Sequence, residues 1–239
     1  MSKASLFENF ESTSEKQWKQ KIQFELQGKD FNDTLVWKSI EEIDVKPFYH
    51  SESYSKCPEI DYNSSDWNIG HSIFVNSVEK SNTNAINLIE SGVESLYFII
   101  PLELISIEAL LENIDLSHIP IYFETLFISE KFTEKLQQYS AKKNTKFYIL
   151  NDPIGQLSKS GNWFENLKSD IENLNKILVS GNELKGVVSV DLGIFQNAGS
   201  SMVQQLAYTL AHVNEYLNLF NSKPIKSIVF KVSVGGNYF

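Results

Sequence analysis

The chain has 239 residues, and 21 basic side chains against 30 acidic ones give it a formal net charge of -9. All of the basic side chains are lysines, because the sequence contains no arginine. The acidic balance argues against nucleic acids and anionic membranes as partners, since both require clustered positive charge. Lysine also lacks the planar fork through which arginine grips a carboxylate or phosphate with two parallel hydrogen bonds. A bidentate anion site of that kind cannot be built from this chain alone.

A hydrophobic share of 42% with 13% aromatic residues indicates a folded core rather than a disordered chain. No apolar run approaches the roughly 20 residues that a membrane-spanning helix needs. Residues 1–9 lack the charged-then-apolar pattern of a secretory signal. The single cysteine, Cys57, cannot form a disulfide within the chain, which is typical of a reducing compartment. We therefore predict a folded, cytoplasmic protein.

Residues 1–70 are predicted to form a helix followed by an extended arm. Ser12 and Glu15 have the spacing of a capping box, and apolar residues then recur every four positions to residue 26. The next ~40 residues show little regular pattern although they carry many aromatic side chains, which is uncommon inside a compact domain. We expect this arm to lie on another surface, either the rest of the chain or a partner. The candidates for partner contact are Trp18, Trp37, Phe48 and Tyr49.

Residues 71–239 alternate between apolar runs and helical patterns. The predicted strands are 71–75, 96–101, 121–127, 146–150, 187–190 and 227–234. The predicted helices are 84–89, 107–114, 130–141, 163–178 and 202–220, and Asn162 and Glu165 have the spacing to cap the fourth of them. Continuous apolar strands favour burial on both faces, as in a parallel sheet covered by helices. Six such units leave two architectures open, a doubly wound sheet or part of an eight-stranded barrel.

The end of the sequence bears on this choice. The chain stops on Tyr238 and Phe239, soon after the sixth predicted strand, and no covering helix follows. We expect a shortened form or partial gene product with a genuine start at Met1, since a complete barrel would need two more strand–helix units.

Both architectures place function beyond the carboxyl ends of their strands. The polar residues predicted at those positions are Glu124, Asn151, Asp152, Asp191 and Gln196. Two neighbouring carboxyl groups can divide the roles of acid and base, because each raises the pKa of the other. The alternative is that these side chains cap helices or bind loop amides.

Other motifs that indicate chemistry are missing. The histidines show no metal-ligand spacing, and we expect His212 to be solvated or hydrogen-bonded within its helix. The four histidines are His50, His71, His118 and His212. Cys57 has no CxxC partner, and no phosphate-binding glycine loop or nucleophile elbow is present. The residues taken alone therefore name no reaction.

Two segments resemble a known family. Residues 37–49, Trp-Lys-Ser-Ile-Glu-Glu-Ile-Asp-Val-Lys-Pro-Phe-Tyr, resemble the W-x-(S/T)-x-E-G-I-x-V-K-P-(L/F)-Y segment that opens the barrel of methylmalonyl-CoA mutases. Residues 189–217 resemble the fifth strand of that barrel with its helix. The resemblance runs in order along the whole chain, with Glu42 standing where the family commonly has glycine.

This resemblance implies a (β/α)8 TIM-type barrel, truncated after about six strands and preceded by the N-terminal helix and arm. Catalytic subunits of the family bind adenosylcobalamin and thread their CoA substrate through the barrel axis. Their catalytic histidine lies in a G-Y-H-M-Q-E-A-G pattern on the fifth strand, and registering that pattern on residues 196–199 places Ile194 at the histidine position. Residues 51–67, which correspond to an arginine-bearing substrate segment of those subunits, contain no arginine.

The resemblance therefore implies a small, non-catalytic subunit of a heterodimeric mutase, whose large catalytic subunit binds adenosylcobalamin and interconverts (R)-methylmalonyl-CoA and succinyl-CoA. In this interpretation the chain has no catalytic, cofactor-binding or metal-binding residues of its own. The alternative is a self-sufficient α/β-barrel enzyme that uses strand-end carboxylates as acid and base.

Overall fold

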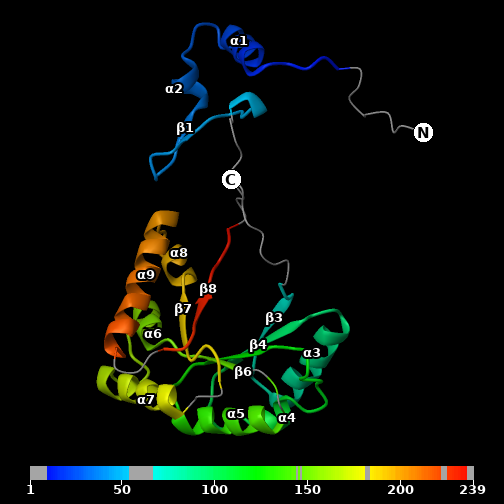
Figure 1. Cartoon of the computed structure of the whole chain (residues 1–239), viewed down its shortest axis with the longest axis vertical. Helices are drawn as coiled ribbons and strands as arrows, with labels where there is room; N and C mark the ends of the chain where they lie inside the picture. The colour runs from blue at the N-terminus through cyan, green and yellow to red at the C-terminus, as the bar shows by residue number, and fades with distance from the viewer. Residues whose placement is uncertain are drawn as a thin grey trace, which may run out of the picture. The chain divides into compact units, whose positions relative to one another are not determined.

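The structure is a computed structural model that describes residues 10–53, 67–143, 145, 147–180, 184–221 and 225–235. Cys57 and most of the segment 51–67 lie outside these residues, as do Tyr238 and Phe239. The chain divides into two compact units, Met1–Ser65 and Asp66–Phe239, and each is described by itself. Figure 1 shows the elements of both.

The first unit holds the predicted helix and a small hairpin. Its elements are α1 (Glu15–Glu25), α2 (Phe31–Leu35), β1 (Trp37–Lys38), β2 (Asp44–Val45) and the 3-10 helix η1 (Ser51–Ser53). The capping box forms between Ser14 and Gln17, so the predicted box of Ser12 and Glu15 is wrong by two residues. Both reciprocal bonds of the box are present at Ser14, which satisfies two free N–H groups of the first turn.

The aromatic candidates of this unit divide into two kinds. The Trp18 ring stacks on Phe48 with a centroid distance of 4.5 Å and meets Phe31 edge-on at 6.4 Å. Trp37 and Tyr49, in contrast, remain 58% and 48% exposed. Trp18 and Phe48 therefore belong to the small core of this unit, whereas Trp37 and Tyr49 leave apolar surface uncovered.

Glu42 has a special backbone conformation. It lies in the β1–β2 connection with a φ of 61°, in the left-handed region that glycine adopts at least cost. The resembled family segment commonly has glycine at this position, whereas Glu42 adopts the left-handed conformation at some energetic cost.

The described residues of the second unit contain six strands, close to the predicted positions. They are β3 (Gly70–Phe74), β4 (Ser95–Ile100), β5 (Ile121–Thr125), β6 (Phe147–Leu150), β7 (Val188–Asp191) and β8 (Ile228–Lys231). Strands β3 to β6 form a parallel sheet in chain order, and β7 and β8 form a parallel pair. Isolated bridges from Tyr148 to Lys185 and from Asn151 to Val188 connect β6 to the segment that contains β7. The prediction of an α/β fold with a parallel sheet is confirmed.

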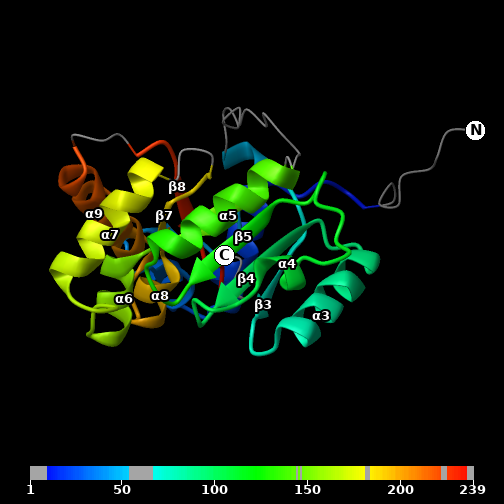
Figure 2. The same ribbon diagram turned by 90° about the horizontal axis from the view of Figure 1, so that it is seen from below.

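Helices follow the strands, and most of them lie along an arc on the outer side of the sheet (Figures 1 and 2). They are α3 (Val78–Glu90), α4 (Ile107–Leu110), α5 (Glu130–Lys143), α6 (Pro153–Ser160), α7 (Leu167–Ser180), α8 (Gly193–Asn197) and α9 (Met202–Leu219). The short helices α6 and α8 were not predicted. The predicted capping by Asn162 and Glu165 is wrong, because α7 begins only at Leu167. The carboxylate of Asp170 accepts hydrogen bonds from the N–H groups of Phe164 and Glu165 and so bends the chain before the helix.

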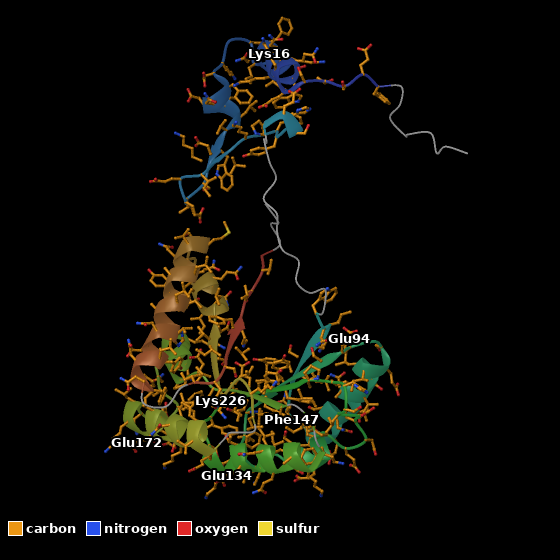
Figure 3. All side chains as sticks on the ribbon, in the orientation of Figure 1. Lys16, Glu94, Glu134, Phe147, Glu172 and Lys226 are labelled. Atoms are coloured by element: carbon orange, nitrogen blue, oxygen red, sulfur yellow. The ribbon has the colours of Figure 1, made fainter. Side chains whose placement is uncertain are left out.

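The core lies between the sheet and these helices. Alternate strand residues point into it, including Phe98, Phe123 and Phe147, and all three are buried. Figure 3 shows Phe147 within this layer and Glu134 and Glu172 on the outer side of α5 and α7. The other sheet face is only partly buried and carries the stacked rings of Tyr97, Tyr122 and Tyr148. The prediction of burial on both faces therefore holds for the helix-covered face and only in part for this second face.

Candidate functional site

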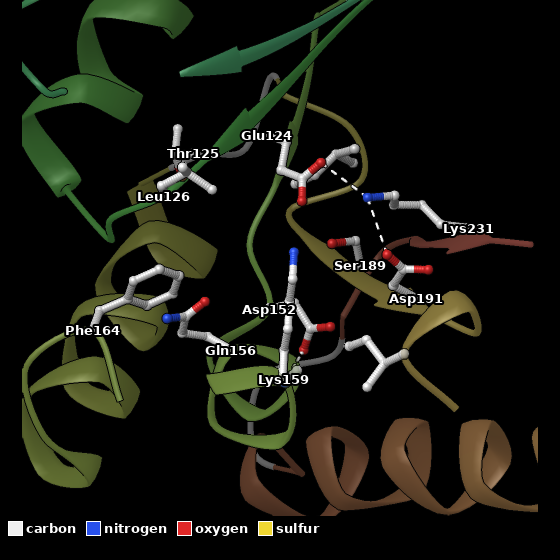
Figure 4. Close-up of a pocket in the computed structure, with 13 residues that line it drawn as sticks. Glu124, Thr125, Leu126, Asp152, Gln156, Lys159, Phe164, Ser189, Asp191 and Lys231 are labelled. Atoms are coloured by element: carbon white, nitrogen blue, oxygen red, sulfur yellow. Dashed lines mark hydrogen bonds and ion pairs between the residues drawn. The ribbon is translucent and has the colours of Figure 1, made fainter. Parts of the chain in front are cut away.

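A small pocket lies beyond the carboxyl ends of the strands (Figure 4). It has a volume of about 50 Å³, which leaves room for only a few water molecules. Its lining comes from β5 to β8, α6, α8 and the chain before α7. The lining residues are Glu124, Thr125, Leu126, Leu150, Asp152, Gly155, Gln156, Lys159, Phe164, Ser189, Asp191, Ile194 and Lys231.

An ion-paired cluster forms one wall of this pocket. The Lys231 ammonium lies 2.9 Å from Glu124 Oε2 and 3.2 Å from Asp191 Oδ2. The Tyr97 hydroxyl donates a hydrogen bond to the same Glu124 oxygen, and Lys231 Nζ lies 5.3 Å from the centre of the Tyr97 ring. The strand alternation explains this convergence, because Tyr97, Glu124, Asp191 and Lys231 all point away from the helix-covered face.

The charges of this cluster shift two pKa values. Burial of the ammonium lowers the pKa of Lys231, but the negative charges of Glu124 and Asp191 outweigh it, so the pKa lies above its ordinary value. Burial raises the pKa of Tyr97, and the Glu124 carboxylate raises it further. Lys231 is thus charged and Tyr97 neutral at physiological pH, and both contact the Glu124 side chain.

A second cluster is organised by Asp152, the N-cap of α6. Its Oδ1 accepts hydrogen bonds from the Gly155 N–H at 2.8 Å and the Tyr216 hydroxyl at 2.7 Å. The same oxygen lies 2.9 Å from His212 Nε2. The Tyr216 hydroxyl also accepts a hydrogen bond from the Ile154 N–H at 3.1 Å. Asp152 therefore joins the start of α6 to the buried side of α9.

Two features of this cluster follow from its close packing. Burial raises the pKa of Tyr216, and the Asp152 charge adds to the effect, so the phenol stays protonated. A Cβ atom on Gly155 would lie 2.0 Å from Asp152 Oδ2, so only glycine leaves room for the carboxylate. The prediction of a solvated or hydrogen-bonded His212 is wrong for solvation, because the side chain is buried. Its Nε2 lies near Asp152 Oδ1, but neither ring nitrogen has a hydrogen-bond partner among the described residues.

The five strand-end candidates reach different surroundings. Glu124, Asp152 and Asp191 all line the pocket. Asn151 is buried behind it, where its side-chain amide donates to the Val187 carbonyl and accepts from the Thr125 hydroxyl. Gln196 lies on α8 and does not line the pocket. The structure thus brings three carboxylates together and gives Asn151 a structural role.

Sequence reasoning missed the basic side chains of the site. Lys231 was a detectable signal, because it is the one charged side chain of the predicted strand 227–234. Lys159 is on the unpredicted helix α6 and points into the pocket (Figure 4). Within the described residues Lys159 has no hydrogen bond or ion pair. Ile194, at the expected histidine position, also lines the pocket, where it has no group that transfers a proton.

The arrangement has limited chemical capacity. Lys231 pairs with two of the three carboxylates, and Asp191 also accepts the Gly193 N–H at 2.8 Å. The third carboxylate belongs to Asp152, and its Oδ1 atom already accepts hydrogen bonds from Gly155 of α6 and Tyr216 of α9. No three histidine, cysteine or acidic side chains in the described part of the chain are placed to hold a metal ion. None of the described helices is both long enough and apolar enough to cross a membrane.

Comparison with known proteins gives one informative match. No protein-family model matches the chain. The chain is 27% identical over 267 aligned positions to a protein of Porphyromonas gingivalis (strain ATCC BAA-308 / W83) named "Methylmalonyl-CoA mutase small subunit". The alignment covers 99% of this chain and 43% of the relative, so the chain spans less than half of the length of the protein it matches. The resemblance predicted from the two sequence segments is confirmed by this similarity.

Proposed function

We propose that this chain is the N-terminal, barrel-bearing part of a small, non-catalytic subunit of heterodimeric methylmalonyl-CoA mutase. Its partner is the large catalytic subunit, which binds adenosylcobalamin and interconverts (R)-methylmalonyl-CoA and succinyl-CoA. The observation that carries the proposal is the pocket itself. At the expected catalytic position it presents Ile194, and beside it Lys231 is paired with Glu124 and Asp191.

The barrel assignment is supported by the order of the strands. All of the pairings between β3 and β6 and between β7 and β8 are parallel and follow chain order. A doubly wound sheet reverses its strand order at a switch point, whereas a (β/α)8 barrel does not. In this proposal residues 1–70 form the subunit-contact arm, and residues 71–239 form a barrel of the mutase type truncated after about six strands.

The non-catalytic role is supported by what occupies the inner face of the sheet. The rings of Tyr97, Tyr122 and Tyr148 stack in a row across three strands, with centroid distances of 6.2 and 4.5 Å. At the carboxyl ends of the strands, Lys231 forms an ion pair with Glu124. A substrate that passes along a barrel axis would have to displace these groups. The absence of arginine from the whole chain also removes the residue best suited to binding its phosphates.

The arm is the proposed contact with the large subunit. Obligate interfaces often bury more than about 2,000 Å², and large aromatic side chains commonly supply much of their binding energy. Trp37 and Tyr49 are the exposed anchors. Trp18 and Phe48 act indirectly in this proposal, because their stacking holds the arm together. A cytoplasmic location stays a prediction and accords with the single cysteine.

Mutase turnover tests the proposal. The 239-residue chain, the large subunit and their mixture are assayed with adenosylcobalamin and (R)-methylmalonyl-CoA. We expect no turnover by this chain alone and co-purification of the two subunits. Replacing Trp37 with alanine should weaken the complex, whereas alanine at Leu104, an exposed residue of the second unit, should not. Turnover by the isolated chain would refute the non-catalytic role, and failure to co-purify would refute the partnership.

The convergence of Glu124, Asp152 and Asp191 keeps one alternative function open, a self-sufficient enzyme with carboxylates as acid and base. The contacts of Asp152 and Asp191 with backbone N–H groups count against it, because each carboxylate already has a structural task. An activity of the isolated chain that is lost in Asp191→Asn and retained in Asn151→Ala would favour this alternative.

A further inference from the structure

The inner side of α9 buries polar groups that the contacts described above do not satisfy. Thr209, His212 and Tyr216 point into the second unit and are 2%, 6% and 0% exposed. The Tyr216 hydroxyl has two partners at the start of α6. The Thr209 hydroxyl and the Nδ1 atom of His212 have no hydrogen-bond partner among the described residues. Because burial removes such atoms from water, most of them in folded proteins bind a further group.

The ring of His212 has a fixed orientation. It stacks on Tyr216 at a centroid distance of 5.3 Å and meets Phe195 of α8 edge-on at 6.5 Å. Its Nε2 atom lies 2.9 Å from Asp152 Oδ1, although no regular hydrogen bond forms between the two. So short a distance to a carboxylate oxygen requires the ring proton on Nε2, because two lone pairs would repel each other there. Nδ1 of the neutral ring is then an acceptor that needs a donor.

Thr209 and Gln196 carry the other unpaired atoms on these two helices. Thr209 precedes His212 by three residues, so their side chains are neighbours on one face of α9, with Cβ atoms about 5–6 Å apart. They form no direct hydrogen bond, and one water molecule can span such a gap. On α8, the helix whose Phe195 meets His212, the buried Gln196 Oε1 is a further acceptor without a partner among the described residues. Thr209 thus offers one donor, and His212 and Gln196 offer one acceptor each.

We propose that one internal water molecule binds between α8 and α9, where it accepts a hydrogen bond from the Thr209 hydroxyl and donates to His212 Nδ1 and Gln196 Oε1. Buried water molecules typically make about three hydrogen bonds, and one accepted bond plus two donated bonds match these three atoms. The bound water holds His212 in the tautomer with its proton on Nε2. A chain of polar contacts then runs from α8 through the water and His212 to Asp152 at the wall of the pocket.

The chemistry of the three atoms favours water over an ion. A metal cation needs several anionic or imidazole ligands, and no three histidine, cysteine or acidic side chains within the described ranges are placed to supply them. An anion would face the lone pairs of His212 Nδ1 and Gln196 Oε1. A neutral molecule with two donors and an acceptor meets neither difficulty. This inference does not depend on the proposed function, because it concerns only the interior of the second unit.

The sign of a stability change tests the proposal. Thr209→Val keeps the branched shape of the side chain and removes its hydroxyl. In urea denaturation of the 239-residue chain, this variant should have a lower midpoint than the parent, because the water loses its donor and the two acceptors lose the water. A hydroxyl that is simply unpaired would give the opposite sign, since an apolar group then replaces a buried polar one. An unchanged or higher midpoint would therefore overturn the proposal. Thr83→Val, at an exposed position of α3, is the matched control and should leave the midpoint nearly unchanged.

Two measurements on the parent chain locate the water and the ring proton. A crystal structure should show one ordered water within hydrogen-bond distance of Thr209 Oγ1, His212 Nδ1 and Gln196 Oε1. Nitrogen-15 NMR of the histidine rings should show the proton of His212 on Nε2, with the signal assigned by its loss in His212→Gln. A crystal structure without this water, or a neutral ring with its proton on Nδ1, would overturn the proposal. Because both measurements use the parent chain, they remain decisive if Thr209→Val does not fold.

Discussion

The ammonium of Lys231 lies 2.9 Å from the Glu124 carboxylate, although 107 residues separate the two in sequence. Glu124 belongs to the four-stranded sheet, and Lys231 belongs to the β7–β8 pair. Only isolated bridges connect these two groups of strands through backbone pairing among the described residues. The ion pair therefore joins the two parts of the sheet across its inner face, and it also occupies one wall of the pocket.

Replacing Lys231 with methionine should destabilise the second unit. The change leaves Glu124 and Asp191 facing each other without a counter-charge at half-buried positions, at a cost of about 1–3 kcal/mol. Urea denaturation of the variant measures this loss. Lys168→Met is the matched control, since Lys168 makes only an exposed pair with Glu172 and should change stability by less than about 0.5 kcal/mol. Equal effects of the two changes would contradict the structural role of Lys231.

The chain should lose stability in alkali. Both Tyr97 and Lys231 have raised pKa values, so the folded state holds their protons more tightly than the unfolded state. Their contribution is complete below about pH 10 and is lost as the pH rises through the folded values. Phenolate absorbance should show that some of the ten tyrosines ionise only as the protein unfolds. Tyr97→Phe should reduce by one the number of tyrosines that ionise only on unfolding. Ionisation of all tyrosines near pH 10 in the folded protein would refute the expectation.

Replacing Tyr216 with phenylalanine should cost about 1–3 kcal/mol of stability. The hydroxyl donates to Asp152 and accepts from the Ile154 N–H, so its removal leaves a backbone donor without its partner. Thermal unfolding compares this variant with Tyr208→Phe, which removes a hydroxyl from a half-exposed tyrosine of the same helix. The Tyr208 variant should melt like the parent chain, and a similar loss in both would show that the Asp152 contact is unimportant.

Replacing Gly155 with alanine should disrupt the start of α6. The new Cβ would lie 2.0 Å from the Asp152 carboxylate and force it away from its three partners, which should cost about 2–4 kcal/mol. Chemical denaturation gives the value, and Ser158→Ala, on the exposed side of the same helix, should have a small effect. An alanine variant as stable as the parent chain would mean that the carboxylate shifts without loss.

The regular elements could be predicted because their causes are local. The apolar runs around Phe98, Phe123 and Phe147 identified the strands, and parallel strands place their carboxyl ends at one edge, which made Glu124, Asp152 and Asp191 candidates. Their spacing in the sequence did not show that they converge. The short helices α6 and α8 were missed because five to eight residues carry too little periodic pattern.

The sequence by itself determined the approximate positions of the strands and the lack of arginine. It also determined the isoleucine at position 194 and the likeness to a mutase subunit. Only the tertiary structure decided that Lys231 pairs with Glu124 and Asp191, and that His212 lies beside Asp152 rather than in solvent. The physical reason is that the energy of an ion pair depends on the distance in space and on the exclusion of water, and neither quantity can be obtained from spacing along the chain.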